Sequence, residues 1–260
     1  MSTETPHPGL RVERDGPVLN VILANGAERN AQVPSLWRAL AHVGESVPGD
    51  VRVVVLRGDG AAFSAGLHRS MLSGGLPGEP DLSALAAAAG DGLDEAIAGF
   101  QRGFTVWGTL PAVVVAAVQG YAIGAGFQLA LAADLRLLAD DAQLAMRETS
   151  LGLVPDLGGT APLVALVGYA RALEICATGR FVGAQEAIGL GLANAVVPIA
   201  ELDAATGDLV AALLAAPTDA LRELKPLLRK AVGAHTEDQV VAERTAQARL
   251  LRGMARPAPR

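Results

Sequence analysis

The sequence predicts an α/β fold in which buried strands alternate with helices and a helical region follows. Residues 51–56 and 112–118 are apolar runs rich in β-branched side chains, which is typical of strands buried on both faces. Each run leads into a turn of small residues and then a helical pattern. After residue 159 the pattern is helical almost to the end. We therefore expect an α/β core over residues 1–198 and a helical region over residues 199–260.

The composition of the chain excludes several classes of protein and of binding site. The chain has 260 residues, of which 51% are hydrophobic and 18% charged, so it has ample material for a buried core. Its formal net charge is -6 and it has no run of Lys and Arg, which argues against nucleic acid as a partner. The lone cysteine, Cys176, excludes an internal disulfide and any multi-cysteine metal site, and we expect no bound metal.

No sequence signal predicts export or membrane insertion. Residues 1–9 are polar and lack an apolar signal core, so we expect a cytoplasmic protein. The uncharged stretch 108–133 is long enough to cross a bilayer, but Pro111, Gly120 and Gly124 interrupt it. We interpret this stretch as a buried strand, a tight turn and a buried helix.

The first half of the chain alternates strand and helix patterns. Apolar alternation on both sides of a turn predicts a β-hairpin over residues 10–23. Helical spacing of apolar side chains predicts helices over 34–43 and 93–107, on either side of the strand at 51–56. Five Gly and Pro residues between positions 73 and 80 predict a flexible loop.

The second half continues the alternation and then becomes helical. A turn at 119–126 and a helix at 127–133 follow the second buried strand. We expect Lys225 and Lys230, in a late helix, to face solvent. Short strands are predicted at 135–138, 143–146 and 195–197, and helices at 162–167, 170–178, 184–189, 202–214, 219–232 and 237–254.

The two buried strands end in turns whose backbone amides have no obvious partner. Small residues let the backbone approach a ligand closely, and a turn that opens a helix adds the positive end of the helix dipole. Two such turns could together form an oxyanion hole from main-chain donors alone. Glycine-rich turns are also common without any ligand, so this pattern by itself leaves the question open.

The residues in these turns resemble a known family. The motifs are Phe63-Ser64-Ala65-Gly66-Leu67, then 119–126 (QGYAIGAG), then Glu148 with the 157–160 segment (LGGT). In this order and spacing they resemble the signatures of the enoyl-CoA hydratase/isomerase, or crotonase, superfamily. The resemblance implies a crotonase-like spiral of ββα units with a C-terminal helical trimerisation region. It also implies an acyl-CoA substrate, no separate cofactor, and a homotrimer or a dimer of trimers.

The resemblance also implies roles for particular backbone positions. The amides of Leu67 and Ala125 correspond to the oxyanion donors of the family. The 73–80 loop is expected to border the acyl pocket. The positions expected to bind CoA or substrate are Asn30, Ala31, Ala65, Gly66, His68 and Gly124.

Three polar side chains decide which reaction is expected. Glu148 matches a catalytic glutamate of the family, and an apolar surrounding would raise its pKa. Gln128 replaces the second glutamate of the hydratases; an amide cannot exchange a proton, so it either orients water or substrate or is merely a polar neighbour. Asp156 stands where dienoyl-CoA isomerases have an acidic group, and the alternative is that it caps the following helix or favours the positive end of that helix.

We therefore favour double-bond isomerisation of an enoyl- or dienoyl-CoA. Hydration of a 2-enoyl-CoA is the first alternative, since it can proceed with one acid and a positioned water. A non-catalytic acyl-CoA binding protein is the alternative from another class, suggested by Gln128 and by the uncommon His68.

Overall fold

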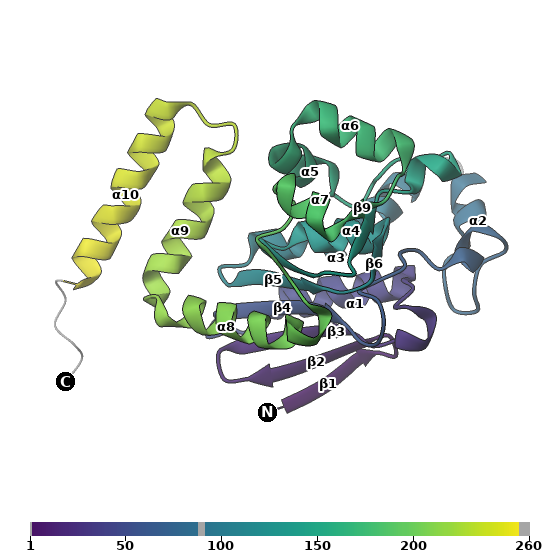
Figure 1. Ribbon diagram of the computed structural model, residues 1–260, viewed down its shortest axis with the longest axis horizontal. Helices are drawn as coiled ribbons and strands as arrows, with labels where there is room; N and C mark the ends of the chain where they lie inside the picture. Colours follow the sequence, from purple (N-terminus) through teal and green to yellow (C-terminus); the bar gives the residue numbers. More distant parts are fainter. Residues whose placement is uncertain (1, 88–91, 255–260) are drawn as a thin grey trace.

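A seven-stranded sheet forms the centre of the computed structural model, which describes residues 2–87 and 92–254 (Figure 1). The strand order is β1-β2-β3-β4-β5-β7-β10, antiparallel from β1 to β3 and parallel from β3 onward. The strands are β1 (Ser2–His7), β2 (Leu10–Asp15), β3 (Val18–Leu23), β4 (Val53–Gly58), β5 (Val113–Val118), β7 (Leu135–Ala139) and β10 (Ala195–Val197). The predicted α/β class is confirmed.

The central strands β4 and β5 are buried on both faces, as their apolar runs predicted. Successive side chains of a strand point to opposite faces. Accordingly Val114 belongs to the larger core under α1, α3 and α4, whereas Val115 belongs to a second core under α8. The helices are α1 (Pro34–Glu45), α2 (Leu82–Ala87), α3 (Gly92–Thr109), α4 (Ala125–Ala132), α5 (Thr160–Val167), α6 (Tyr169–Thr178), α7 (Ala184–Gly189) and α8 (Leu202–Ala215), with α9 (Thr218–Ala231) and α10 (Thr236–Met254) after them.

Aromatic side chains join α1 to α3 in the larger core. Trp37 contacts Phe100 and Phe104 edge to face, with ring centroids 5.3 and 5.8 Å apart. Gly103 allows this approach, because a Cβ there would overlap the carbonyl oxygen of Trp37. The apolar face predicted for residues 93–107 is therefore the packing face of α3 over its second half, where Phe100, Phe104 and Trp107 are buried.

Three strands were not predicted, one at the edge of the large sheet and two in a second sheet. β1 is an exposed edge strand whose polar side chains give no apolar alternation, and backbone pairing with β2 alone defines it. The segment predicted as a turn at 119–126 contains the strand β6 (Tyr121–Ile123), which pairs with β8 (Gln143–Ala145). A second sheet forms from β6, β8 and β9 (Val182–Gly183), and it carries the turn that precedes α4.

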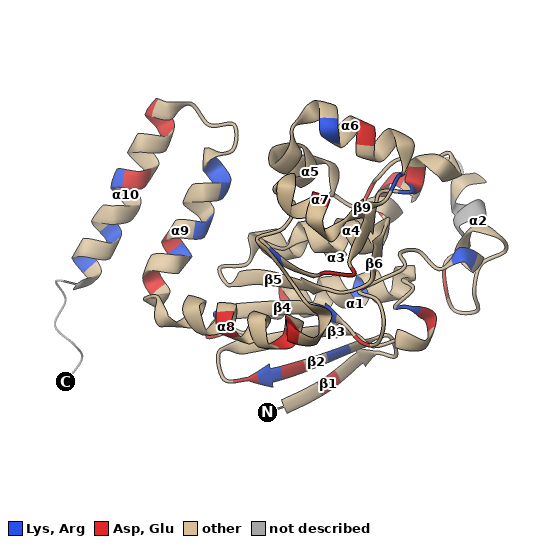
Figure 2. Ribbon diagram, viewed as in Figure 1, with Lys and Arg blue, Asp and Glu red and all other residues tan. Residues whose placement is uncertain are grey.

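The helices α9 and α10, called here the C-terminal arm, lie side by side and extend away from the sheet (Figure 1). Figure 2 shows that acidic residues lie toward the start of α10 and cationic residues toward its end, and that α9 carries residues of both signs. No helix within residues 2–87 and 92–254 is long and apolar enough to cross a membrane. The division of the chain at residue 198 stays a prediction.

The expectation that Lys225 faces solvent is wrong. Its ammonium group is buried at the base of the C-terminal arm, 2.7 Å from Asp134 Oδ2, and donates to the carbonyl of Ala112 at 2.7 Å. Burial lowers the pKa of Lys225, and Asp134 acts in the opposite direction. Lys230, one turn further along, is exposed as expected. The ion pair of Lys225 and Asp134 therefore fixes α9 to the end of the sheet.

Candidate functional site

The two turns singled out in the sequence lie against each other. Ser64 forms a parallel bridge with Ala122, and the Ile123 amide donates to the Ser64 carbonyl at 3.0 Å. Gly66 has a φ of +82°, and a Cβ there would overlap the carbonyl oxygen of Ile123 and lie 3.5 Å from the Ala125 nitrogen. Glycine at position 66 is thus required both for its backbone conformation and for the close approach of the turns.

The amides of Leu67 and Ala125 are both uncommitted. On either side of Leu67, the Gly66 carbonyl accepts from the Gln32 amide at 2.7 Å, and the His68 amide donates to the Gln32 carbonyl at 2.8 Å. Ala125 is the first residue of α4, so its amide lies outside the helical ladder. Neither amide has an acceptor within the part of the chain that the structure describes. Their assignment as oxyanion donors stays a prediction, and the geometry leaves both available for it.

Ser64 and Gln32 support the first turn, and the sequence reasoning assigned neither a role. The Ser64 hydroxyl donates to the Asn30 carbonyl at 2.8 Å and accepts from the Gly66 amide at 3.1 Å and the Gln32 side chain at 3.0 Å. Both side chains are fully buried. The available signal for Ser64 was its place as a polar residue inside the first motif.

Glu148 lies next to the second turn. It begins the 3-10 helix Glu148–Leu151, which Thr149 ties to α6 by donating to the Cys176 carbonyl at 2.6 Å. Its carboxylate is close to Gly124, where a Cβ would lie 3.2 Å from Glu148 Oε1. The carboxylate therefore stands beside the residue that precedes the Ala125 amide.

The electrostatic state of Glu148 suits proton transfer. Oε1 accepts from Gln128 Nε2 at 2.7 Å, whereas Oε2 is buried and has no hydrogen-bond partner among the described residues. Burial raises the pKa of Glu148, and the charge of Asp156 adds to this, while the Gln128 hydrogen bond acts in the opposite direction. A buried carboxylate oxygen without a partner is costly, so its retention here points to a function.

The side chain of Gln128 is buried, and hydrogen bonds hold its amide group at both ends. Its side chain is 1% exposed, and its oxygen accepts from the amides of Leu157 and Gly159 at 2.9 and 3.3 Å. Its nitrogen is the donor to Glu148. Both ends of the amide are therefore engaged, and Gln128 connects the Glu148 carboxylate to the 157–159 turn.

Asp156 does not cap a helix. The N-cap of α5 is Gly159, and no side chain caps this helix. The Asp156 carbonyl accepts from Gln101 Nε2 at 2.7 Å, and burial raises the pKa of its carboxyl group. The capping alternative is therefore wrong. Glu148 and Asp156 are both half-buried carboxyl groups with raised pKa values, and the charge of Asp156 contributes to the raised pKa of Glu148.

The positions predicted for CoA binding fall into two groups. The Asn30 side chain is buried and donates to the carbonyls of Asp59 and Ala62 at 2.9 and 2.8 Å, so it supports this segment from inside. Ala31 and His68 line a cavity of about 440 Å³, called here the α1 cavity. Ala65 adjoins these positions, and its amide donates to the Arg29 carbonyl at 2.8 Å. Contacts of these residues with CoA stay predictions.

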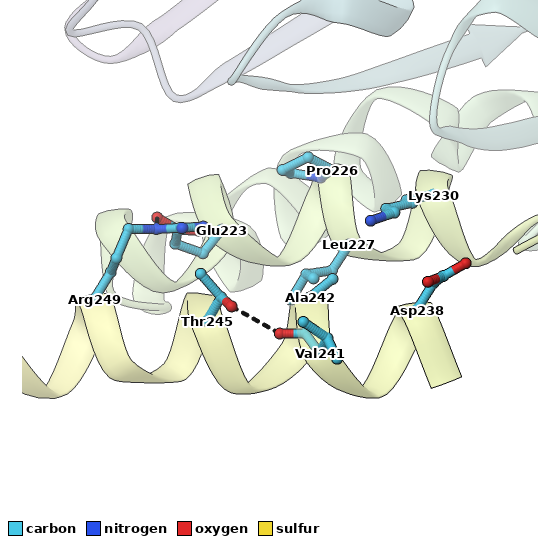
Figure 3. A pocket seen from close by; sticks show the side chains of 9 residues that line it. All are labelled: Glu223, Pro226, Leu227, Lys230, Asp238, Val241, Ala242, Thr245 and Arg249. Carbon is cyan, nitrogen blue, oxygen red and sulfur yellow. Dashed lines mark hydrogen bonds and ion pairs between the residues drawn. The ribbon is translucent and has the colours of Figure 1, made fainter. Parts of the chain in front are cut away.

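Another cavity, of about 450 Å³, lies between the two helices of the C-terminal arm (Figure 3). Arg249 of α10 reaches Glu223 of α9 there, with 2.8 Å between Nε and Oε1. None of the residues predicted to bind or transform a substrate lines it. We therefore place the chemistry at the two turns and not in the arm.

Comparisons with known proteins identify the family of this chain. The family model for enoyl-CoA hydratase/isomerase matches residues 13–255. The carnitinyl-CoA dehydratase of Salmonella typhi is 34% identical over 225 residues, which cover 85% of this chain and 80% of that protein. A crystal structure of "a putative enoyl-CoA hydratase from Thermobifida fusca YX in complex with acetoacetyl-CoA" is 49% identical, with a TM-score of 0.89 and coverage of 94% of this chain and 95% of that one. An enoyl-CoA hydratase structure from Bacillus anthracis is 28% identical, with a TM-score of 0.79, and covers 92% of this chain and 90% of its own. The chain belongs to the enoyl-CoA hydratase/isomerase family.

Proposed function

We propose that this enzyme moves a double bond in an enoyl- or dienoyl-CoA. The observation that carries the proposal is the engagement of Gln128 at both ends of its amide, with Glu148 and with the 157–159 turn. A hydratase mechanism with two glutamates has no second carboxylate at this position. The ionisable pair available is Glu148 and Asp156, and two such groups suit removal of a proton at one carbon and its return at another.

In this mechanism the thioester oxygen lies between the amides of Leu67 and Ala125. These donors stabilise the negative charge that grows on the oxygen as the enolate forms, and one such donor is worth about 10²–10³ in rate. Glu148 removes the proton through Oε2, the oxygen that has no hydrogen-bond partner in the part of the chain that the structure describes. Asp156 returns a proton to the other end of the conjugated system.

Product analysis tests this assignment. The purified enzyme is incubated with 2-enoyl-, 3-enoyl- and dienoyl-CoA thioesters, and the products are separated by mass. Isomerisation leaves the mass of the thioester unchanged, whereas hydration adds one water. Formation of 3-hydroxyacyl-CoA as the main product would contradict the isomerase proposal.

Asp156→Asn is expected to slow isomerisation by about 10²-fold or more, because the second proton-transferring group is lost. The fold should be little affected, since the Asp156 hydrogen bond to Gln101 uses the backbone carbonyl. Turnover of a 3-enoyl-CoA and the thermal unfolding midpoint are measured together. Normal turnover by this variant would remove Asp156 from the mechanism.

Reversible hydration is the second candidate, and the relatives favour it. Their names are carnitinyl-CoA dehydratase and enoyl-CoA hydratase. A dehydratase removes water from the acyl chain of a CoA thioester, and a hydratase adds water to it. In this case one of the two carboxyl groups, Glu148 or Asp156, would accept a proton from the attacking water, and the other would give a proton to the carbon next to the thioester. A non-catalytic acyl-CoA binding protein, the remaining alternative, would bind thioesters tightly and convert none of them.

We also propose that the protein assembles as a homotrimer or a dimer of trimers through the C-terminal arm. The arm exposes a set of large apolar side chains on two helices that extend from the sheet, and such surfaces mark contact sites between proteins. The exposed set comprises Leu224, Leu228, Val232, Val240, Val241 and Leu251. Light scattering coupled to gel filtration should give a mass three or six times that of the chain; a monomer would contradict the proposal.

A further inference from the structure

We propose that Glu79 fixes the 73–80 loop to the start of α1, and that this attachment controls access of the acyl-CoA to the site. The loop contributes Leu76, Pro77 and Glu79 to the wall of the α1 cavity, whose wall also contains Ala31 and His68. His68 directly follows Leu67, one of the two predicted oxyanion donors. The inference rests on the proposed function only for the identity of the ligand.

The loop has little structure of its own to hold it in place. Gly74, Gly75 and Gly78 have positive φ angles, and the backbone hydrogen bonds of the loop are local turns, such as Gly75 to the Ser70 carbonyl at 2.8 Å. Within the described residues, the hydrogen bonds that join side chains of residues 73–80 to the rest of the chain are both made by Glu79. The position of the loop therefore depends on this one carboxylate.

The Glu79 carboxylate accepts hydrogen bonds at the N-terminus of α1, where the N-cap residue provides no side-chain acceptor. The N-cap of this helix is Val33, which has no side-chain oxygen, and Pro34 occupies the first helical position. The next amide, that of Ser35, donates to Glu79 Oε2 at 2.9 Å, and the Ser35 hydroxyl donates to Oε1. A carboxylate at the positive end of a helix is favourable. The loop thus supplies the cap that the sequence before α1 lacks.

His7 fixes the direction of these hydrogen bonds. Its Nδ1 accepts from the Gly9 amide at 2.9 Å, so Nε2 carries the hydrogen and donates to the Ser35 hydroxyl at 2.9 Å. Burial lowers the pKa of His7, which favours this neutral ring, while Glu79 acts in the opposite direction. The imidazole is a donor to Ser35 and not a base toward it. The cluster is therefore an anchor for the loop and not a nucleophilic triad.

Hydrogen exchange of the full-length protein tests the attachment. In Glu79→Gln the amide nitrogen cannot accept the Ser35 hydroxyl proton, so exchange in peptides that cover residues 70–81 should rise about fivefold, the scale of a lost helix cap. Ser35→Ala should act in the same direction, and the double variant should exchange no faster than the stronger single one, because both changes break one contact. Glu45→Gln, at the exposed far end of α1, is the matched control. Exchange equal to that of the control in both single variants would overturn the attachment.

Ligand access is tested separately. Glu79→Gln should raise KM for the thioester several-fold and leave kcat within about twofold, since the loop contributes to binding and not to chemistry. A fall in kcat at unchanged KM would overturn this part. If the wild type converts no thioester, the proposed function fails, and the Kd of coenzyme A by calorimetry takes the place of KM. An equal Kd for the wild type and Glu79→Gln would then overturn control of access.

Discussion

Replacing Glu148 with glutamine is expected to abolish incorporation of solvent deuterium into the acyl chain, with a loss of about 10²–10⁴ in rate. Glutamine keeps the size of the side chain, and its oxygen can still accept from Gln128 Nε2, as Glu148 Oε1 does at 2.7 Å. The group that takes the proton is lost, while the amides of Leu67 and Ala125 are untouched. Affinity for coenzyme A should therefore persist, and mass spectrometry of the recovered thioester in D₂O measures the loss.

The same variant should be more stable than the wild type at neutral pH. Burial raises the pKa of Glu148 above the ordinary value of 4.5, so the folded state binds this proton more tightly than the unfolded state. By linkage, ionisation of Glu148 costs stability as the pH rises from 4.5 through the raised pKa. Glutamine has no such ionisation. The difference in unfolding midpoint should be present at pH 7 and disappear below pH 4.5.

Glu243→Gln is the control, because Glu243 is exposed on α10 and lies outside the site. Glu243→Gln should change neither the incorporation of solvent deuterium into the acyl chain nor the unfolding midpoint. Normal deuterium incorporation by Glu148→Gln would show that another group moves the proton. A variant that is less stable than the wild type at pH 7 would show that the carboxylate is stabilised in a way that its contacts do not reveal.

The sequence predicted the parts of this site that depend on local pattern. The apolar runs gave β4 and β5 with both faces buried, and the motifs after β4 and before α4 placed Gly66, Leu67 and Ala125 where two turns meet. The expected rise in the pKa of Glu148 agrees with its burial, and its role in proton transfer stays a prediction. These features depend on residues close in sequence, or on spacing that the family shares.

Features that depend on packing between distant segments were not predicted. The side chain of Gln128 reaches the 157–159 turn only because α4 and that turn pack together, so its role as a connector could not be read from its position in a motif. A polar edge strand such as β1 gives no apolar alternation. Lys225 lies on a helix with a charged face, and its burial depends on Asp134, which is distant in sequence.

Lys225→Met is expected to lower the free energy of unfolding by about 3–5 kcal/mol, the cost of removing one partner from a buried ion pair. Lys225 is 8% and Asp134 17% exposed at the side chain, so water can replace the lost ammonium group only in part. Asp134 would keep its hydrogen bond from the Val114 amide at 2.8 Å and a longer contact with the exposed Arg229 at 3.4 Å. The urea midpoint at one fixed protein concentration measures the loss, since assembly would make stability depend on concentration.

A double variant separates the ion pair from simple loss of packing. In Lys225→Met with Asp134→Asn, no buried charge is left without its partner, and the neutral amide oxygen can still accept from the Val114 amide. The double variant should therefore be more stable than Lys225→Met alone, with a coupling of about 1–3 kcal/mol. Lys230→Met, exposed on the same helix, should change stability by less than about 0.5 kcal/mol. Additive losses in the double variant would mean that Lys225 stabilises α9 by packing of its alkyl chain, and that its charge has no part in holding the arm against the end of the sheet.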